Sequence, residues 1–222
     1  MNTAARTRAL AVAVLLSGAL AVASAPWALA LPALNFVFKP LTTVLILAHA
    51  WPRGHDLPAV RRWVLIGLVF SLAGDVFLMW PKEGFLPGLI SFLLAHLAYL
   101  WAFTRVTRLA AKPLVFVGYG LLAAVILSQL WPGVPGALRA PVVAYVLCLA
   151  GMAAQAAVVW RSGSARGAVL ALGGALFMTS DALLATNKFA VALPLSNLWI
   201  LATYWAAQWC IASWLSPASE KP

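Results

Sequence analysis

The chain has 222 residues, of which 64% are hydrophobic and only 9% charged, whereas a soluble domain is nearer half apolar and a quarter charged. A water-soluble fold of this length could not bury so much apolar surface in one core, which argues against a soluble globular protein. The net charge of +10 could indicate a nucleic-acid partner, but the basic residues lie in short loops between long apolar runs. We therefore expect no nucleic-acid binding and predict an all-α integral membrane protein in a lipid bilayer.

Eight apolar runs follow one another along the chain, each close to the 20 or so residues that a transmembrane helix needs. Pro, Gly and Trp residues mark the breaks between the runs, and tryptophans at span ends are typical of the aromatic belts at membrane interfaces. The sequence predicts one transmembrane domain over 1–222, with spans near 7–25, 34–51, 62–80, 86–103, 113–131, 140–160, 167–186 and 193–215.

The first run also has features of a signal peptide. Arg6 and Arg8 precede it and Ala23-Ser24-Ala25 ends it, which is the pattern of a cleavable leader. Pro26 follows directly and disfavours cleavage there, and the alternation of loop charge works with this span retained. We expect it to be retained.

The basic residues predict the orientation. Three of them, Lys82, Arg139 and Lys188, fall on one side of the predicted arrangement, Lys39 lies just inside a span, and the other eleven fall on the opposite side. By the positive-inside rule that opposite side is cytoplasmic, and an even number of spans places both termini there. The Ala, Leu and Arg-rich composition suggests a bacterial inner (plasma) membrane. The eleven are Arg6, Arg8, Arg53, Arg61, Arg62, Arg105, Arg108, Lys112, Arg161, Arg166 and Lys221.

Two of the five acidic residues, Asp75 and Asp181, fall inside predicted spans. An ionisable group there costs about 2.5–3.5 kcal/mol on insertion scales, so each one requires a reason. Both are expected about five residues from the outer end of an outward-running span. A lysine follows each aspartate by seven residues, at Lys82 and Lys188. These similarities suggest a parallel internal repeat of four plus four helices.

Other polar residues lie within or beside the spans. Lys39 is expected near the depth of the two aspartates, His96 and Tyr99 at mid-depth or deeper, and Asn187 and Lys188 at the outer rim. His96 and Tyr99 are three apart and Tyr204 and Gln208 four apart, so each pair shares a helix face. The simplest arrangement is one polar pocket that opens towards the outer half and is lined by spans two, three, four, seven and eight. The alternative is structural: an aspartate pairs with Lys39 and the other groups form interhelical hydrogen bonds. The full set is Lys39, His96, Tyr99, Asn187, Lys188, Tyr204 and Gln208.

Two carboxyl groups in a low-dielectric site tend to separate into a protonated and an ionised member. That pair provides an acid and a base, which suits hydrolysis of an acid-labile ether or acetal-like bond. The chain has no Gly-x-Ser-x-Gly, His-Glu-x-x-His or Cys-x-x-Cys motif, and His49 and His55 are expected far from the aspartates. We therefore expect no metal and no other cofactor. Cys148 and Cys210 lie in apolar runs and are expected to be small packing residues.

Several short motifs, in one order along almost the whole chain, resemble the YhhN-like family of membrane proteins, whose characterised animal members are lysoplasmalogenases. One position departs from the family pattern, because Ala95 stands where a glycine is expected before the histidine. The motifs are Lys39-Pro40-Leu41-Thr42-Thr43, Gly74-Asp75-Val76-Phe77-Leu78-Met79, His96-Leu97-Ala98-Tyr99, Gly174-Ala175-Leu176-Phe177, Ser180-Asp181, Asn187-Lys188-Phe189 and Tyr204 to Gln208.

The resemblance implies hydrolysis of the vinyl-ether bond of a lysoplasmalogen, a lysophospholipid, to a fatty aldehyde and a glycerophospho-head group. One of Asp75 and Asp181 would be the general acid, and the other would stabilise the cation and activate water. A related lysolipid or a different ether remains open as the natural substrate. A small proton-coupled transporter that uses the same aspartates is the alternative function. The implied orienting residues are His96, Tyr99, Tyr204 and Gln208, and the implied substrate-binding residues are Lys39, Asn187 and Lys188.

Overall fold

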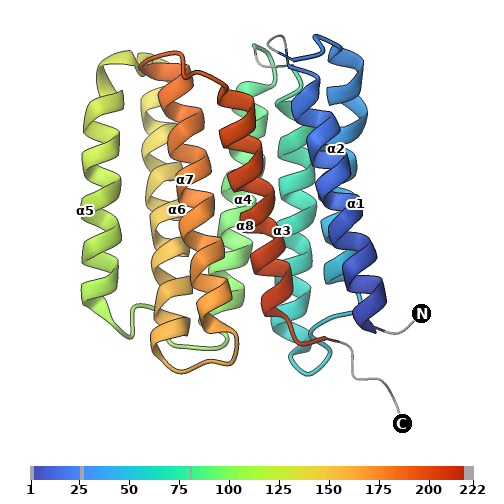
Figure 1. Ribbon diagram of the computed structural model, residues 1–222. Helices are drawn as coiled ribbons and strands as arrows, with labels where there is room; N and C mark the ends of the chain where they lie inside the picture. The colour runs from blue at the N-terminus through green and yellow to red at the C-terminus, as the bar shows by residue number, and fades with distance from the viewer. Residues whose placement is uncertain (1–2, 26–27, 81, 218–222) are drawn as a thin grey trace.

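The computed structural model describes residues 3–25, 28–80 and 82–217, and this part of the chain is helical, with no strand. Its helices stand side by side in one bundle, in which successive helices run in opposite directions (Figure 1). The start of α1 and the end of α8 lie at the same end of the bundle (Figure 1). The bounds are α1 Thr3–Ala23, α2 Pro32–Ala50, α3 Pro58–Phe77, α4 Phe85–Thr104, α5 Pro113–Leu130, η1 Trp131–Gly133, α6 Gly136–Arg161, α7 Gly167–Phe189 and α8 Ser196–Trp214.

Each predicted span coincides with one helix, and the predicted ends differ from the observed ends by at most four residues. Six helices (α1, α2, α4, α5, α6 and α7) are long and apolar enough to cross a membrane. The other two are of similar length, but α3 carries Arg61, Arg62 and Asp75, and α8 carries Asn197 and Gln208. The chain is therefore a multi-pass α-helical membrane protein. Pro26 and Lys221, which entered the predictions on the first span and on orientation, lie outside the described residues.

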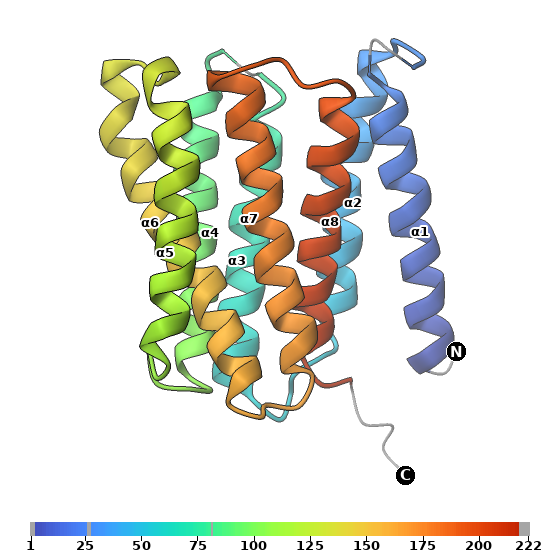
Figure 2. The same cartoon turned by 60° about the vertical axis from the view of Figure 1, so that its left-hand side comes forward.

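The helices differ in their position within the bundle. α1 stands at one edge beside α2, and α5 stands at the opposite edge (Figures 1 and 2). The most extensive packing is between α7 and α8 and between α3 and α4. The intramembrane polar residues of α3, α4, α7 and α8 therefore lie on helices that other helices cover, and not on the lipid-facing edge.

Two glycines allow α3 to approach α4 closely. Gly67 and Gly74 lie two helical turns apart, and a Cβ atom at either position would overlap an aromatic ring of α4, from Tyr99 or Phe92 respectively. Small residues at such crossings are typical of membrane helix packing. Gly74 directly precedes Asp75, so this close packing also fixes the position of that carboxyl group.

The end of the bundle where α1 begins is held together by polar contacts to the end of α8. Arg53 donates to the backbone oxygens of Leu215 (3.1 Å) and Ser213 (3.3 Å), and Arg166 donates to that of Leu215 (3.1 Å). His49 lies within 3.0 Å of the Ser213 hydroxyl. Cationic side chains on the last carbonyls of a helix satisfy their hydrogen bonds and complement the helix dipole. Both arginines, like His49, thus serve the packing of this end.

The two aspartates do not occupy equivalent positions on their helices. Asp75 lies two residues before the end of α3 at Phe77, whereas Asp181 lies eight residues before the end of α7 at Phe189. The expectation of about five residues for both was wrong, because α3 gives way to a turn at Leu78 and α7 continues past its predicted end. The four-plus-four repeat stays a prediction.

Candidate active site

A polar cavity of about 370 Å³ lies between α2, α3, α4, α7 and α8. These are the five helices on which the sequence places its intramembrane polar residues. The cavity lies towards the end of the bundle opposite to the start of α1, because its lining comes from the first turns of α2 and α8 and the last turns of α3 and α7. The predicted site residues in its lining are Lys39, Asp75, Asp181, Asn187, Lys188 and Tyr204.

Asp75 is almost fully buried, at 1% exposure, and two hydroxyl groups donate to it. Its Oδ2 accepts hydrogen bonds from Thr43 Oγ1 (2.6 Å) and from the Tyr204 hydroxyl (2.8 Å). The Lys39 ammonium lies 4.0 Å from its Oδ1. Lys39 and Thr43 are one turn apart on α2, so one face of that helix supplies both groups. Hydrogen-bond donors and a cation stabilise the charged form of a carboxyl group, so these contacts offset part of the cost of burying Asp75.

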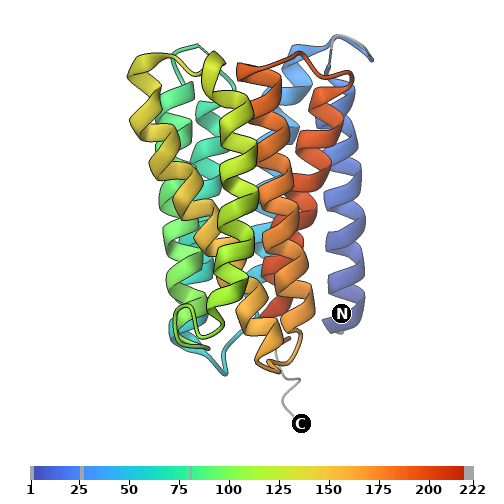
Figure 3. The ribbon, with the colours of Figure 1, turned by 90° about the vertical axis from the view of Figure 1, so that its left-hand side faces the viewer.

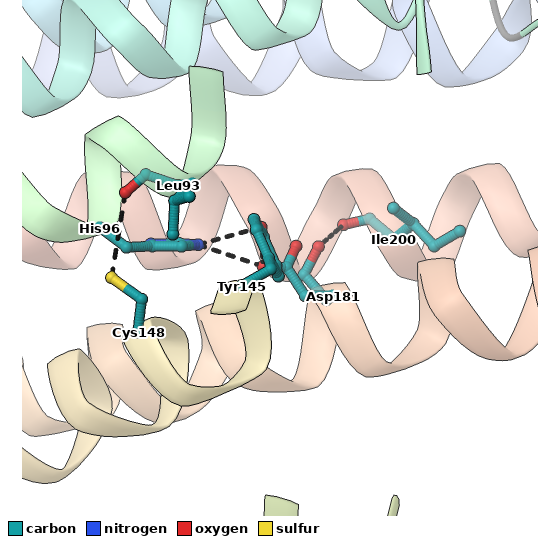
Figure 4. A network of polar contacts seen from close by, with 7 residues as sticks. Leu93, His96, Tyr145, Cys148, Asp181 and Ile200 are labelled. Atoms are coloured by element: carbon teal, nitrogen blue, oxygen red, sulfur yellow. Dashed lines mark hydrogen bonds and ion pairs between the residues drawn. The ribbon is translucent and has the colours of Figure 1, made fainter. Parts of the chain in front are cut away.

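Asp181 has a different set of partners, which come from α4 and α6 (Figure 4). The Tyr145 hydroxyl donates to its Oδ2 at 2.6 Å. His96 Nε2 lies 3.3 Å from the same Oδ2 and 3.0 Å from the Tyr145 oxygen. Beside it, the Ser180 hydroxyl donates to the Ile200 carbonyl at 3.0 Å, which ties α7 to α8.

The proton on His96 can be placed from these contacts. His96 is fully buried, and its Nδ1 has no partner within the described part of the chain. A buried N–H without an acceptor is costly, so the neutral tautomer with its proton on Nε2 fits best. His96 and Tyr145 then both donate to Oδ2 of Asp181. Among the described residues, nothing is bonded to Oδ1, which is available to a ligand.

Tyr99 and Gln208 lie outside the cavity lining. The Tyr99 hydroxyl donates to Gln208 Oε1 at 2.7 Å, and both side chains are fully buried. Neither is hydrogen-bonded to a carboxyl group, so this pair links α4 to α8. Their orienting role stays a prediction, and any such effect would have to pass through Tyr204, one turn from Gln208.

Two residues near the end of α7 form part of the cavity rim. The Lys188 side chain is exposed, and its ammonium lies 4.0 Å from the centre of the Phe85 ring. Asn187 Oδ1 accepts a hydrogen bond from the backbone N–H of Leu193 at 2.9 Å. Asn187 therefore fixes the loop after α7, whereas Lys188 is free to meet an anionic group.

Comparison with known proteins shows the family to which this chain belongs. The model of the YhhN family matches residues 34–215. The chain belongs to the YhhN family. It is 40% identical over 178 residues to "Lysoplasmalogenase TMEM86B" of Sus scrofa, covering 76% of this chain and 69% of that protein. It is 36% identical over 174 residues to "Lysoplasmalogenase TMEM86A" of Homo sapiens, covering 76% and 71%.

A bacterial relative is more distant. "Lysoplasmalogenase" of Mycobacterium bovis is 29% identical over 175 residues, covering 71% of this chain and 63% of that protein. No solved structure shows a significant match to the chain. The resemblance to the YhhN family that the sequence motifs indicated is confirmed.

Two residues in the site of this YhhN-family chain were missed from the sequence. Thr43 donates to Asp75 and Tyr145 donates to Asp181. Thr43 could have been found because it lies one turn after Lys39 on the same helix face. Tyr145 could have been found because it and Gln155 are polar residues in the otherwise apolar run 140–160.

The other candidate ligands among the described residues do not gather into a second site. In the part of the chain that the structure describes, no group of three or more His, Cys, Asp or Glu side chains is placed to hold a metal ion. Both cysteines are free, and Cys148 Sγ lies 3.9 Å from the Leu93 carbonyl oxygen (Figure 4).

Proposed function

We propose that this YhhN-family chain is a membrane-embedded lysoplasmalogen hydrolase and that Asp75 and Asp181 carry out its chemistry. The observation that carries the proposal is that the carboxyl groups of Asp75 and Asp181 line one polar cavity, together with the cationic Lys39 and Lys188. The relatives named lysoplasmalogenases supply the reaction class. A lysoplasmalogen combines an anionic head group, an acid-labile vinyl ether and one hydrocarbon chain, and the cavity offers cations and acid/base groups inside a membrane protein.

The proposed reaction begins with transfer of a carboxylic-acid proton to the β-carbon of the vinyl ether. The double bond supplies the electrons of the new C–H bond, and the ether oxygen stabilises the resulting oxocarbenium ion. The second carboxyl group, as a carboxylate, removes a proton from water while the water oxygen bonds to the ether carbon. The hemiacetal then loses its hydroxyl proton to the first carboxylate, and its C–O bond breaks as the second carboxyl group protonates the departing glycerol oxygen. The products are an aldehyde and an alcohol, and both carboxyl groups return to their starting states.

Lysines around the cavity can bind the anionic head group, whereas a carboxylate stabilises the cationic intermediate. Lys39 lies 4.0 Å from Asp75, close enough to hold that carboxylate in place and to meet the substrate phosphate. Lys188 at the rim provides a second cation for the phosphate, and Tyr204 fixes Asp75 through its hydroxyl. Such preorganised charges act strongly in a site from which water is largely excluded.

The proposal includes the topology of the chain. All eight helices cross the membrane, because the polar residues of α3 and α8 face the interior of the bundle or lie near one of its two ends. The basic residues of α1 and of the loops after α2, α4 and α6 share one end, where α8 also finishes. By the positive-inside rule this end is cytoplasmic, so the polar cavity belongs to the outer half of a bacterial inner membrane.

The test is aldehyde release from a synthetic 1-alkenyl lysophospholipid by the purified full-length protein in detergent. The matched control substrates are the saturated 1-alkyl ether and the 1-acyl ester with the same head group. We expect stoichiometric fatty aldehyde and glycerophospho compound from the alkenyl lipid and no cleavage of the alkyl ether. Cleavage of the ester alone, or of none of the three by folded protein, would contradict the proposal.

Proteoliposomes separate this proposal from the transporter. An enzyme changes the lipid, whereas a carrier moves solute and leaves the lipid intact. The relatives named as lysoplasmalogenases favour the enzyme. Proton movement across the bilayer without any loss of alkenyl lipid would favour the carrier.

A further inference from the structure

A second cavity lies behind Asp181 and has no part in the reaction described above. It measures about 80 Å³ and lies between α4, α5, α6 and α7. Its lining is apolar except for Tyr145 and Asp181. The residues that it shares with the polar cavity are Leu78, Phe85, Phe92, Asp181 and Leu184. The two cavities therefore meet at Asp181, whereas Asp75 lines only the polar one.

The apolar cavity continues towards the lipid. A groove of about 390 Å³ lies between α5 and α7 and shares Ile126, Met178 and Ala182 with the apolar cavity. α5 stands at the edge of the bundle beside α7 (Figure 3), and Leu122 and Val125 on it are half exposed. The groove thus adjoins the apolar cavity, and the apolar cavity adjoins the polar one. Together they lead from the surface of the bundle to the two aspartates.

We propose that the apolar cavity and the groove between α5 and α7 bind the hydrocarbon chain of the substrate, and that Asp181 is consequently the proton donor to the vinyl ether. This rests on the proposed function and adds to it the place of the chain and the separate roles of the two aspartates. The apolar cavity and the groove suit a single hydrocarbon chain, because their lining carries no charged group apart from the Asp181 carboxyl group at the inner end of the cavity. The larger apolar groove of about 640 Å³ between α1 and α8 shares no lining residue with the polar cavity, so a chain there would not bring the reacting bond to the aspartates.

The order of atoms in the substrate assigns the roles. In a 1-alkenyl lipid the β-carbon lies on the chain side of the double bond, and the ether carbon and oxygen lie on the head-group side. With the chain behind Asp181 and the phosphate near Lys39 and Lys188, the β-carbon faces Asp181 and the ether carbon faces Asp75. Asp181 gives its proton from Oδ1, which His96 and Tyr145 leave free. Asp75, held by two hydroxyl donors, takes the proton of the attacking water.

The chain site is tested by filling the apolar cavity. Ala123 of α5 is buried and lines it, whereas the adjacent Ala124 is exposed, so Ala123→Phe and Ala124→Phe form a matched pair. We expect Ala123→Phe to lower kcat/KM for long-chain alkenyl substrates by about tenfold or more while sparing short-chain ones, because the lost apolar contacts scale with buried chain. Ala124→Phe should behave as wild type. Hydrolysis by wild type with the same chain-length profile in both variants would overturn the inference and leave the proposed function standing.

Photolabelling tests the same site in the wild-type protein. It requires neither hydrolysis of the lipid nor a variant that folds correctly. The probe is a 1-alkyl ether lysophosphocholine with a diazirine at the end of its chain, added to the wild-type protein in lipid nanodiscs. Labelled peptides from α5, α6 and α7 that compete with unlabelled lysolipid would support the inference. Labelling confined to α1 and α8 would overturn it, whether or not the protein hydrolyses the lipid.

The role of Asp181 is tested by the pH profile of the two Asn variants. Without its internal acid, Asp181→Asn must draw the proton from solution, so its residual rate above the protein-free reaction should rise about tenfold per unit fall in pH. Asp75→Asn keeps the internal acid and should lack this dependence; the reverse pattern would overturn the assignment. The titratable and charged groups that face Asp181 or its cavities are His96 of α4, Tyr145 of α6, Lys188 of α7, Tyr119 of α5, Lys39 of α2, Asp75 of α3 and Tyr204 of α8.

Discussion

Asp75 and Asp181 are chemically identical groups in two different surroundings. Asp75 accepts hydrogen bonds from Thr43 and Tyr204 and faces the Lys39 ammonium, and its side chain is 2% exposed. The Asp181 side chain is 12% exposed. A neutral His96 and Tyr145 hold it, and within the described residues its ion-pairing partners include no lysine or arginine.

In the proposed reaction, this difference would let one residue type supply both the acid and the base. Asp75 has a cation and two donors beside it, whereas Asp181 has two donors and lies where the polar cavity meets an apolar one. Two carboxyl groups with unlike environments are the usual basis for such a division of labour. The predictions below change the surroundings of one carboxyl group, of both together, or, at Gln208, of neither.

The largest effect among the supporting residues is expected from Lys39. Lys39→Met removes the cation beside Asp75, and we expect kcat to fall about 100-fold, as when one preorganised charge or donor is lost from a catalytic site. Lys188→Met is the matched control, because Lys188 is exposed at the rim and contacts neither carboxyl group; it should mainly raise KM. Steady-state kinetics on the alkenyl lysolipid would separate the two, and equal effects on kcat would remove the special role of Lys39.

A smaller effect is expected from the hydroxyl donors. Thr43→Val and Tyr145→Phe each remove one hydrogen bond, from Asp75 and from Asp181 respectively, while keeping the shape of the side chain. Each should lower kcat/KM about tenfold, the size expected for one hydrogen bond to a charged or buried partner. Since the two changes act on different carboxyl groups, the effects in the double variant should multiply. A double variant no worse than either single one would show that the two carboxyl groups form a single hydrogen-bonded unit.

The smallest effect on activity is expected at Gln208, which touches neither carboxyl group. Gln208→Leu leaves the buried Tyr99 hydroxyl without its acceptor, and this should cost about 1–3 kcal/mol of stability while kcat per folded molecule stays within about threefold of wild type. Adding Tyr99→Phe replaces both partners by apolar groups and should restore most of the lost stability. Thermal unfolding in detergent with parallel kinetics measures both quantities. A large loss of kcat in the variant that carries both Gln208→Leu and Tyr99→Phe would indicate that this pair takes part in the reaction.

The helices could be predicted because the bilayer fixes the length of an apolar span. Their ends could not, because local chemistry decides them. α3 begins at Pro58, four residues before the predicted span, since proline suits the first position of a helix and Arg61 and Arg62 can extend their charges past the apolar region. α7 extends to Phe189, beyond the predicted 186, and ends where Asn187 holds the following loop.

The polar cavity could be predicted because charged groups in spans are costly and must gather around a common space. Thr43 and Tyr145 escaped prediction because a hydroxyl group is inexpensive in a span and gives a weak signal. Nothing in the sequence indicated the apolar cavity behind Asp181. Its lining residues, such as Ala123 and Val142, are ordinary apolar residues, and a void among them depends on how the side chains of four helices pack.

Aldehyde release from a 1-alkenyl lysophospholipid by wild type, Asp75→Asn and Asp181→Asn tests the central claim most directly. Asn keeps the shape of each side chain and removes its titratable proton, and Glu83→Gln on the exposed loop before α4 is the matched control for loss of an acidic group. We expect rapid release by wild type and by Glu83→Gln, and a loss of about 10²- to 10⁴-fold in each aspartate variant, the range for removal of a general acid or base. Wild-type rates in either folded aspartate variant would contradict the account.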